Sequence, residues 1–191
     1  MRLIPAFAVA GLLVASVTHA ATAIPAPQTS TSPTARANAQ LIENFYSAFQ
    51  RRDGEAMAAS YATDAHFSDP VFTNLNGSEP GDMWRMLTSK AQDFSLVFDG
   101  IRADEQSGEA HWVATYTFSK TGRKVVNDIH SRFSFRDGKI AVQQDSFDLW
   151  KWTRQALGAP GYLLGWSGMV QGKIRGQAAQ GLADFRKDKG R

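Results

Sequence analysis

Two segments near the middle of the chain alternate between apolar and polar residues, as half-buried β-strands do: residues 124–135 and 140–150. Between them stands Asp137-Gly138, the dipeptide that best supplies the positive φ angles of a two-residue hairpin turn. If these two residues form the loop, Phe135 lies opposite Ile140. The pattern therefore predicts a long β-hairpin with an apolar face.

The same register sets His130 opposite Asp145. Directly opposed residues on one face of an antiparallel pair have Cβ atoms about 4.5–5.5 Å apart. We therefore expect an imidazole and a carboxylate to be neighbours, on the face opposite the apolar pairs. Such a sheet could form the floor of a pocket that contains a His–carboxylate pair.

The segments before this hairpin predict helices first and strands afterwards. Apolar residues recur at helical spacing from Asn38 until residues 51–54 break the pattern, and two further helices are expected at 55–61 and 82–91. Strands are expected at 65–69, 94–103 and 110–119. This order indicates an α+β domain over residues 38–150, with three helices against one face of a strongly bent antiparallel sheet.

Both ends of the chain differ from this domain in composition. Residues 1–20 have the charged start, apolar run and small-residue end of a signal peptide, so we expect export to the periplasm or the medium. Residues 21–37, rich in Pro, Thr, Ser and Ala, predict a flexible linker. Residues 151–191 predict a helical extension with a basic tail.

Charge and cysteine content exclude several classes of function. Residues 171–191 hold six Lys or Arg and two Asp or Glu, whereas residues 21–170 have a net charge of −2. The basic character therefore belongs to the tail and does not indicate a nucleic-acid surface. The chain has no cysteine, so it has no thiolate nucleophile, thiolate metal site or disulfide framework. No motif for a metal or a cofactor is present, and we expect neither.

The extension leaves two interpretations open. Apolar residues follow a spacing of three or four from Leu163 to Phe185, and Gly168, Gly172 and Gly176 form a series of small residues beside them. One interpretation is a helix packed on the domain or on a second subunit. The other is an interfacial helix that contacts a membrane with its apolar side and has basic residues on its polar side.

Several motifs, taken in order, resemble the NTF2-like superfamily in its SnoaL-like and ketosteroid-isomerase-like branch. The motifs are LIENFYSAF (41–49), YATDA (61–65) followed by FSDP (67–70), and FSFRDGKI (133–140) followed by DSFD (145–148). The resemblance covers residues 38–150 and implies a cone: three helices against a bent sheet, with a pocket inside. The superfamily includes isomerases, cyclases, hydrolases and non-catalytic binders, so the fold alone does not fix the function.

The resemblance also implies a set of site residues. Asp69, before Pro70, matches the place of the isomerases' general base. Counting back from the hairpin places the isomerases' proton-donating acid at His130, whereas counting forward from Gly122 places it at Ser131. We prefer His130 because it opposes Asp145, which itself resembles the acid on the last strand of limonene-epoxide-type hydrolases.

Some positions of those families are occupied differently in this sequence. The isomerases' tyrosine on the first helix falls at Phe45, next to Tyr46, and the hydrolases' inner-strand arginine and acid fall near Ala114 and Tyr116. We take Phe45, Tyr46, Trp84 and Phe147 as candidate substrate contacts.

Three functions remain in competition, of which the third is a structural or surface-associated protein that binds anionic lipid through its basic tail. The first is a cofactor-free isomerase, cyclase or hydrolase that acts on a small hydrophobic carbonyl-type molecule, with Asp69, His130 and Asp145 as its catalytic residues. The second is an exported, non-catalytic protein that binds a lipophilic ligand or a partner. The resemblance also implies pairing through the outer sheet face, where Phe133, Phe135, Ile140 and Val142 are expected. This leaves two alternatives open: a homodimer, or a monomer in which the C-terminal helices cover that face.

Overall fold

The computed structural model describes residues 24–28, 30–90 and 93–190. The predicted signal peptide, residues 1–20, lies outside the described residues, as does the start of the predicted linker.

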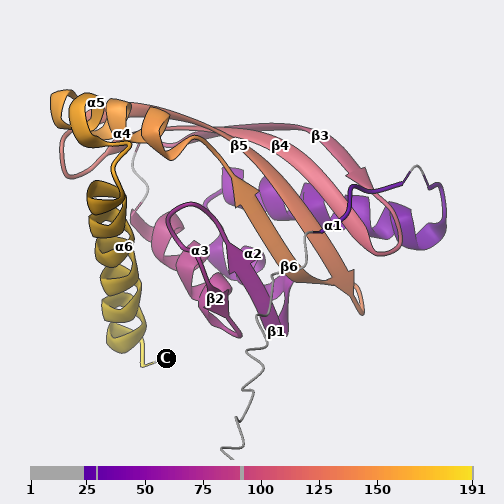
Figure 1. The fold of residues 1–191 in the computed structure, drawn as a ribbon. Coiled ribbons are helices and arrows are strands. Elements are labelled where there is room, and N and C mark those ends of the chain that lie inside the picture. The colour runs from indigo at the N-terminus through magenta and orange to yellow at the C-terminus, as the bar shows by residue number, and fades with distance from the viewer. Residues whose placement is uncertain (1–23, 29, 91–92, 191) are drawn as a thin grey trace, which may run out of the picture.

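Three helices and a single curled sheet form the main body (Figure 1). The helices are α1 Pro33–Gln50, α2 Gly54–Ala59 and α3 Glu79–Lys90. α1 begins at Pro33 and not at Asn38, because the Ser32 hydroxyl accepts a hydrogen bond from the Ala35 amide and Pro33 occupies the first helical position. The last part of the predicted linker is therefore helical.

The sheet has six strands in the order β2-β1-β6-β5-β4-β3. The strands are β1 Tyr61–Ser68, β2 Leu75–Asn76, β3 Ser95–Ala103, β4 Ser107–Phe118, β5 Arg123–Arg136 and β6 Lys139–Ser146. Neighbouring strands are antiparallel except β1 and β6, which are parallel. The predicted α+β class with an NTF2-like bent sheet is thus confirmed.

The predicted hairpin turn is confirmed, but the register beyond it is not. Asp137 and Gly138 have φ angles of 53° and 70°, and Phe135 pairs with Ile140 as expected. A β-bulge follows, in which Ala141 is the extra residue, so that Ser134 pairs with Val142. Because side chains alternate between faces, one extra residue moves all later residues of β6 to the opposite face.

The bulge overturns the predicted His130–Asp145 pair. Ser131 lies opposite Asp145, and His130 lies opposite Ser146. Ser131 and Asp145 are buried inside the cone, whereas His130 is exposed on the outer face. The sequence pattern could not reveal this, because a bulge leaves the apolar alternation of β5 unchanged.

The core inside the cone is built mainly from aromatic rings. Phe45 and Tyr46 of α1 pack edge to face with ring centroids 5.2 Å apart, and both are fully buried. Phe133 and Ile140 are also fully buried in this core. They therefore cannot form the outer dimer surface that we expected from them.

The extension forms three helices that run over one end of the cone (Figure 1). They are α4 Leu149–Leu157, α5 Ala159–Leu164 and α6 Gly168–Asp188. β6 ends at Ser146, before the predicted end at Trp150, because the Asp148 side chain caps α4 by accepting from the Lys151 amide.

α6 lies beside α3 and contributes Ala178, Leu182 and Phe185 to the core. The predicted glycine series on α6 does not pack against the described part of the chain, because a Cβ at Gly168, Gly172 or Gly176 would have no described atom within 4 Å. Among the described residues, no helix combines the length and the apolar character that crossing a membrane requires.

Candidate active site

Asp145, on the inner face of β6, is the centre of a buried polar network. The Ser131 hydroxyl donates a hydrogen bond of 2.6 Å to Oδ1 of Asp145, and Nε2 of Gln143 donates one of 3.0 Å to the same oxygen. The described residues give Oδ2 no hydrogen bond, and Asp145 keeps 7% of its surface exposed. One carboxyl oxygen is therefore held in place while the other is available.

Ser131 is itself held by two aromatic side chains. The Tyr46 hydroxyl donates to Ser131 Oγ at 2.7 Å, and Nε1 of Trp112 donates to the same oxygen at 2.8 Å. Both acceptor positions of the hydroxyl are thus occupied, so its own proton has to go to Asp145. Tyr46, a predicted substrate contact, is a fully buried positioning residue in this network.

Gln143 is fixed in the same way from the other side. The Tyr61 hydroxyl donates to Oε1 of Gln143, and it accepts a bond of 2.8 Å from Nε1 of Trp84. The Gln143 amide group then has its nitrogen directed at Asp145. Both chains of hydrogen bonds, one through Ser131 and one through Gln143, end at Oδ1 of Asp145. Such cooperative chains hold a buried group in one orientation.

The surroundings of Asp145 raise the pKa of its carboxyl to about 7. Burial is the main cause, because removing a carboxylate from water disfavours the charged form. The hydrogen bonds from Ser131 and Gln143 lower this pKa, and the negative charge of Asp69 raises it. Asp145 can therefore gain or lose a proton near neutral pH.

Asp69 directly follows β1, the strand that pairs with β6, and so lies near the level of Asp145. β1 and β6 run parallel with Phe67 beside Gln143, and two residues further along each chain come Asp69 and Asp145. Oδ1 of Asp69 accepts hydrogen bonds from the amides of Val71 and Phe72, which is ordinary turn chemistry. Burial nevertheless raises the pKa of Asp69 to about 6.

The other predicted site residues fall into two groups. Phe45 is buried in the core next to the network, Trp84 belongs to the network through its bond to Tyr61, and Phe147 is partly buried against the same core. His130 lies outside the cone, so it cannot share a substrate with Asp145. Ser131, the alternative that forward counting gave, takes its place beside the carboxyl.

The sequence did not lead us to Gln143 and Tyr61. Both side chains face inward only because of the bulge and because β1 begins at Tyr61, four residues before the predicted strand. The sequence contained one signal for these polar residues in the interior: two glutamines and an aspartate follow the apolar residues 140–142 of the same strand.

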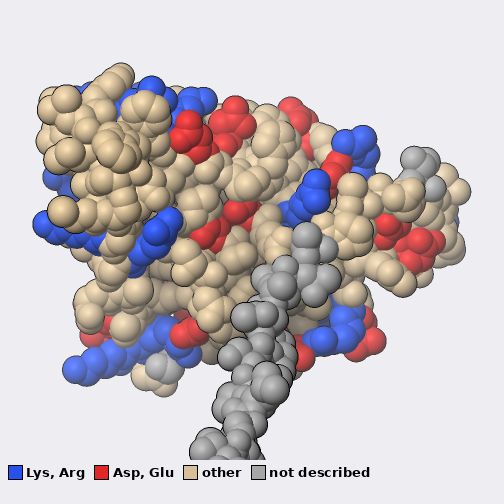
Figure 2. All heavy atoms as spheres, in the orientation of Figure 1, with Lys and Arg blue, Asp and Glu red and all other residues tan. Residues whose placement is uncertain are grey.

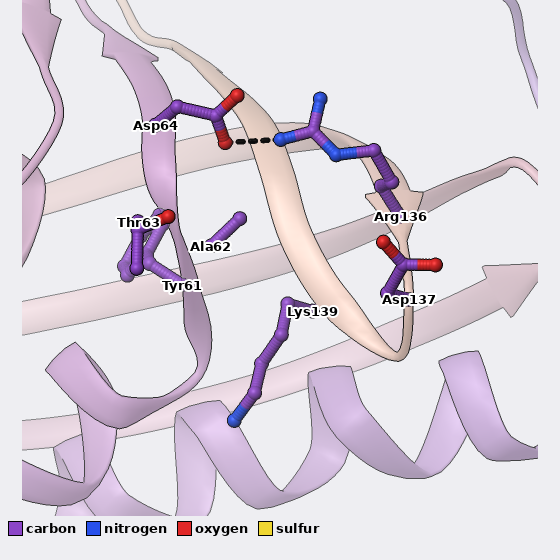
Figure 3. A pocket seen from close by; sticks show the side chains of 7 residues that line it. All are labelled: Tyr61, Ala62, Thr63, Asp64, Arg136, Asp137 and Lys139. Atoms are coloured by element: carbon purple, nitrogen blue, oxygen red, sulfur yellow. Dashed lines mark hydrogen bonds and ion pairs between the residues drawn. The ribbon is translucent and has the colours of Figure 1, made fainter.

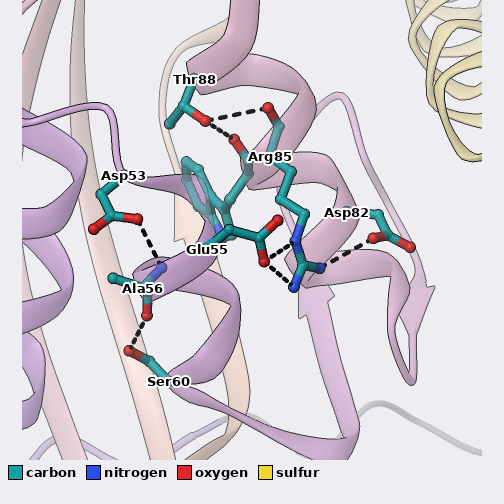
Figure 4. A network of polar contacts seen from close by, with 8 residues as sticks. Asp53, Glu55, Ala56, Ser60, Asp82, Arg85 and Thr88 are labelled. Atoms are coloured by element: carbon teal, nitrogen blue, oxygen red, sulfur yellow. Dashed lines mark hydrogen bonds and ion pairs between the residues drawn. The ribbon is translucent and has the colours of Figure 1, made fainter. Parts of the chain in front are cut away.

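Two hollows on the surface of the described residues lie away from Asp145. One, of about 500 Å³, lies between the start of β1 and the β5–β6 turn, where Arg136 pairs with Asp64 (Figure 3). The other, of about 290 Å³, lies among α2, α3 and the end of α6, and Arg85 and Glu55 are on its wall (Figure 4). Neither is lined by Asp69 or Asp145.

The extension covers the end of the cone where Asp69 lies. Arg175 of α6 donates from Nε to the Pro70 carbonyl at 2.9 Å, directly after Asp69. From α4, Nε1 of Trp152 donates to the Tyr116 hydroxyl at 2.8 Å. Burial, and to a smaller extent the charge of Asp69, raises the pKa of Tyr116.

Solved structures share the fold of the domain. A putative SnoaL-like polyketide cyclase from Jannaschia sp. CCS1 is 11% identical over 70% of this chain and 100% of its own, with a TM-score of 0.61. An LEH-like epoxide hydrolase from M. tuberculosis is 19% identical over 65% and 92%, with a TM-score of 0.56. A ketosteroid isomerase-like protein from Catenulispora acidiphila DSM 44928, in complex with trimethylamine, is 14% identical over 64% and 95%, with a TM-score of 0.55.

At these identities the solved structures establish the fold alone. No curated protein matches the chain. The family comparison is more specific, since the model of the SnoaL-like domain matches residues 42–143, more than half of the chain, from α1 to Gln143 of the network. The chain therefore belongs to the SnoaL-like domain family.

Proposed function

We propose that this protein is a cofactor-free acid/base enzyme that acts on a small hydrophobic molecule with a carbonyl or epoxide oxygen. The observation that carries the proposal is the orientation of the network: its donors converge on Oδ1 of Asp145, and Oδ2 remains for a substrate. A carboxyl group with a pKa of about 7 in an apolar interior is suited to proton transfer.

The two carboxyl groups divide the chemistry between them. Burial raises the pKa of both carboxyl groups toward neutral pH, and we assign the acid to Asp145, whose orientation the network fixes, and the base to Asp69. Protonated Asp145 donates its Oδ2 proton to the substrate oxygen. Asp69 takes a proton from a carbon next to a carbonyl, or from the water that opens an epoxide. Ser131 and Gln143 act as positioning residues that fix the carboxyl plane of Asp145.

The family and the fold support this class of substrate. The Jannaschia and M. tuberculosis neighbours are described as a polyketide cyclase and an epoxide hydrolase, and both reactions act on an oxygen-bearing hydrophobic skeleton. The aromatic interior around Asp145 suits such a skeleton. A charged or phosphorylated substrate would have no counterion among the buried residues of the network.

The test is turnover on a panel of an aromatic epoxide, a β,γ-unsaturated cyclic ketone and a polyketide-like aldehyde precursor. We expect one class to be converted, and Asp145→Asn and Asp69→Asn each to lower kcat by a factor of about 100 or more. His130→Ala is the matched control, since its side chain lies outside the cone, and it should retain full activity. Unchanged turnover in Asp145→Asn would refute the proposal.

A second candidate is a non-catalytic binder of a lipophilic ligand, favoured by the tight packing of the interior around Asp145. Native mass spectrometry of the purified chain would identify a bound small molecule. Binding without conversion, equal in the wild type and in Asp145→Asn, would establish this function in place of the first.

Export is a separate proposal that rests on the sequence of residues 1–20. We propose that this segment is removed during secretion. N-terminal sequencing of the protein recovered outside the cytoplasm should then begin near residue 21. A mature protein that keeps residues 1–20 would contradict it.

A further inference from the structure

A row of ionisable side chains crosses the outer face of the sheet, away from the Asp145 network. Asp99 of β3 pairs with His111 of β4, and His111 pairs with His130 of β5. Asp128, two residues before His130 on the same strand, shares this face. The proposed acid/base chemistry uses none of these four residues.

The side chains of this row are close together. His111 Nε2 lies 2.9 Å from Oδ1 of Asp128, and His111 Nδ1 lies 3.0 Å from Oδ1 of Asp99. The rings of His111 and His130 have centroids 4.8 Å apart. One potential ligand atom from each of His111, Asp128 and His130 falls within 4.8 Å of the other two.

We propose that His111, Asp128 and His130 form a site for a divalent transition-metal ion, with zinc as the reference ion. Two imidazole nitrogens and one carboxylate are a ligand set that zinc prefers, and water completes its coordination. Ligand atoms 4.8 Å apart reach bonding distances of about 2.0–2.2 Å by small side-chain rotations.

Asp99 supports His111 from the side opposite the metal. A metal-bound histidine usually donates its second N–H to a carboxylate, which fixes the ring and its tautomer. Asp99 accepts from Nδ1 of His111 and so leaves Nε2 for the ion. The four residues lie on three adjacent strands, so the backbone holds their spacing.

Two features weaken binding of the ion: a nearby positive charge, and a proton that competes for His111 and makes the affinity depend on pH. Lys151 of α4 brings a positive charge to Asp128. Nε2 of His111 lies 2.9 Å from a carboxylate oxygen of Asp128, and the ion has to displace the proton that this nitrogen shares with Asp128. Binding should therefore be stronger at pH 8 than at pH 6.

The test is isothermal titration of the full chain with zinc chloride after treatment with a chelator. We expect one zinc ion per chain, and at least a tenfold loss of affinity in His130→Ala and in Asp128→Asn. His66→Ala is the matched control because His66 bonds to Asn76 at the sheet edge, and it should bind zinc as the wild type does. Asp99→Asn should weaken binding by about 10–100-fold.

His130 and Asp128 are exposed, so their variants should fold, and circular dichroism without metal checks this. Equal zinc affinity in the wild type and in His130→Ala would overturn the proposal, as would the lack of saturable binding at about 100 µM zinc. Asp145→Asn should bind zinc normally, which separates this site from the proposed enzyme activity.

A different observation concerns the tip of the extension, where large apolar side chains face the solvent. Tyr162, Leu163, Leu164, Trp166 and Met169 are each at least 55% exposed. In Figure 2 the end of the molecule formed by α4 and α5 is mostly free of charge, with Lys and Arg side chains at its margin. We call these five residues the apolar tip. Monomeric proteins rarely expose so contiguous an apolar surface without using it.

The charge around the apolar tip indicates what it binds. Between Asp148 and Asp184 the chain has no acidic residue, whereas it has Lys151, Arg154, Lys173 and Arg175. The Arg154 guanidinium lies 4.5 Å from the Trp150 ring centroid and 5.8 Å from that of Tyr162. We infer that the apolar tip inserts into the surface of an anionic lipid bilayer. A second copy of the chain fits less well, since it would bring two positive surfaces together.

The test is co-sedimentation with vesicles of phosphatidylcholine, with and without phosphatidylglycerol. We expect binding only to the anionic vesicles, weaker at high salt, and a loss of at least tenfold in Leu163→Ser/Leu164→Ser/Trp166→Ser. Val97→Ser is the control because Val97 is exposed to a similar extent on β3. Equal binding by the triple variant would overturn the inference, as would a dimer that the triple substitution dissociates.

Discussion

The Ser131 hydroxyl lies 2.6 Å from Oδ1 of Asp145 inside the cone, whereas without the bulge Asp145 would lie opposite His130 on the outer face of the sheet. A single extra residue in β6, Ala141, decides between the two. The chemistry of the interior is therefore set by a β-bulge. The hydroxyl is a neutral donor, so Asp145 has no positive partner and its pKa stays high.

Replacing Ser131 with alanine tests this relationship. The change removes the donor to Asp145 and leaves the Tyr46 hydroxyl and the Trp112 N–H without their acceptor. We expect the free energy of unfolding to fall by about 1–3 kcal/mol, measured by urea denaturation. The pKa of Asp145 should rise above about 7, because the hydrogen bond that lowers it is lost.

His130→Ala is the matched control for Ser131→Ala. The two residues are adjacent on β5 but face opposite sides of the sheet, so in a metal-free buffer His130→Ala should change the unfolding free energy by less than about 0.5 kcal/mol. If the two variants lost equal stability, the register described here would be wrong.

The raised pKa of Asp145 makes stability depend on pH. Its folded value, about 7, lies above the ordinary 3.8, so between these values the folded protein keeps a proton that the unfolded chain loses. The contribution of this group is fully present below pH 3.8 and is lost as pH rises through 7. Asp69, with a folded pKa of about 6, acts in the same direction.

Asp145→Asn isolates this effect, since asparagine is similar in shape and does not ionise. Relative to the wild type, the variant should gain about 2–3 kcal/mol of unfolding free energy between pH 5 and pH 8. Urea denaturation of both proteins across this range measures the difference, in which the titrating groups that do not interact with Asp145 cancel. A constant difference would mean that Asp145 titrates normally in the folded protein.

The extension is joined to the domain through a buried ion pair. Asp82 of α3 is almost fully buried, and its carboxylate lies 3.1 Å from Nε of Arg186 and 3.1 Å from Nη1 of Arg85, which also contacts Glu55 (Figure 4). Arg186→Met removes one of the two cations. We expect a loss of about 1–3 kcal/mol in urea denaturation, and faster hydrogen exchange in α6 than in β5.

Lys187→Met is the control for Arg186→Met because Lys187 is its neighbour on α6 and takes part in no described ion pair. It should leave both stability and exchange unchanged. Equal effects of the two substitutions would show that the general charge of the tail, and not the pair with Asp82, holds α6 in place.

Local chemistry was enough to predict much of this fold. Asp137-Gly138 supplies positive φ angles and so fixes the hairpin turn, and the spacing of Ile42, Phe45 and Phe49 fixes the buried side of α1. These features depend on residues a few positions apart. The resemblance to the family then supplied the order of helices and strands.

The candidate site could not be predicted in the same way. Whether Ser131 or His130 faces Asp145 depends on the Ala141 bulge, and no turn residue marks that position in the sequence. The parallel pairing of β1 with β6, which places Asp69 near the level of Asp145, joins segments more than seventy residues apart. Such long-range relationships follow from the packing of the whole sheet and not from any one motif.

Glycine positions distinguish close packing from open surface in this chain. A Cβ at Gly54, at the start of α2, would lie 2.7 Å from the Cα of Arg85, because α2 and α3 touch there. A Cβ at Gly172, inside α6, would have no described atom within 4 Å. The two positions should therefore respond to alanine in opposite directions.

We expect Gly54→Ala to destabilise the protein by about 1–3 kcal/mol, because the new methyl group would clash with the Arg85 backbone as well as with the Thr88 hydroxyl, and the backbone cannot move aside as a side chain can. Gly172→Ala should stabilise it by about 0.5–1 kcal/mol, since alanine is the better helix former and costs the unfolded chain conformational freedom. Thermal and urea denaturation of both variants measure the signs. A loss of stability in Gly172→Ala would show that this side of α6 packs closely against another surface, as the glycine series first indicated.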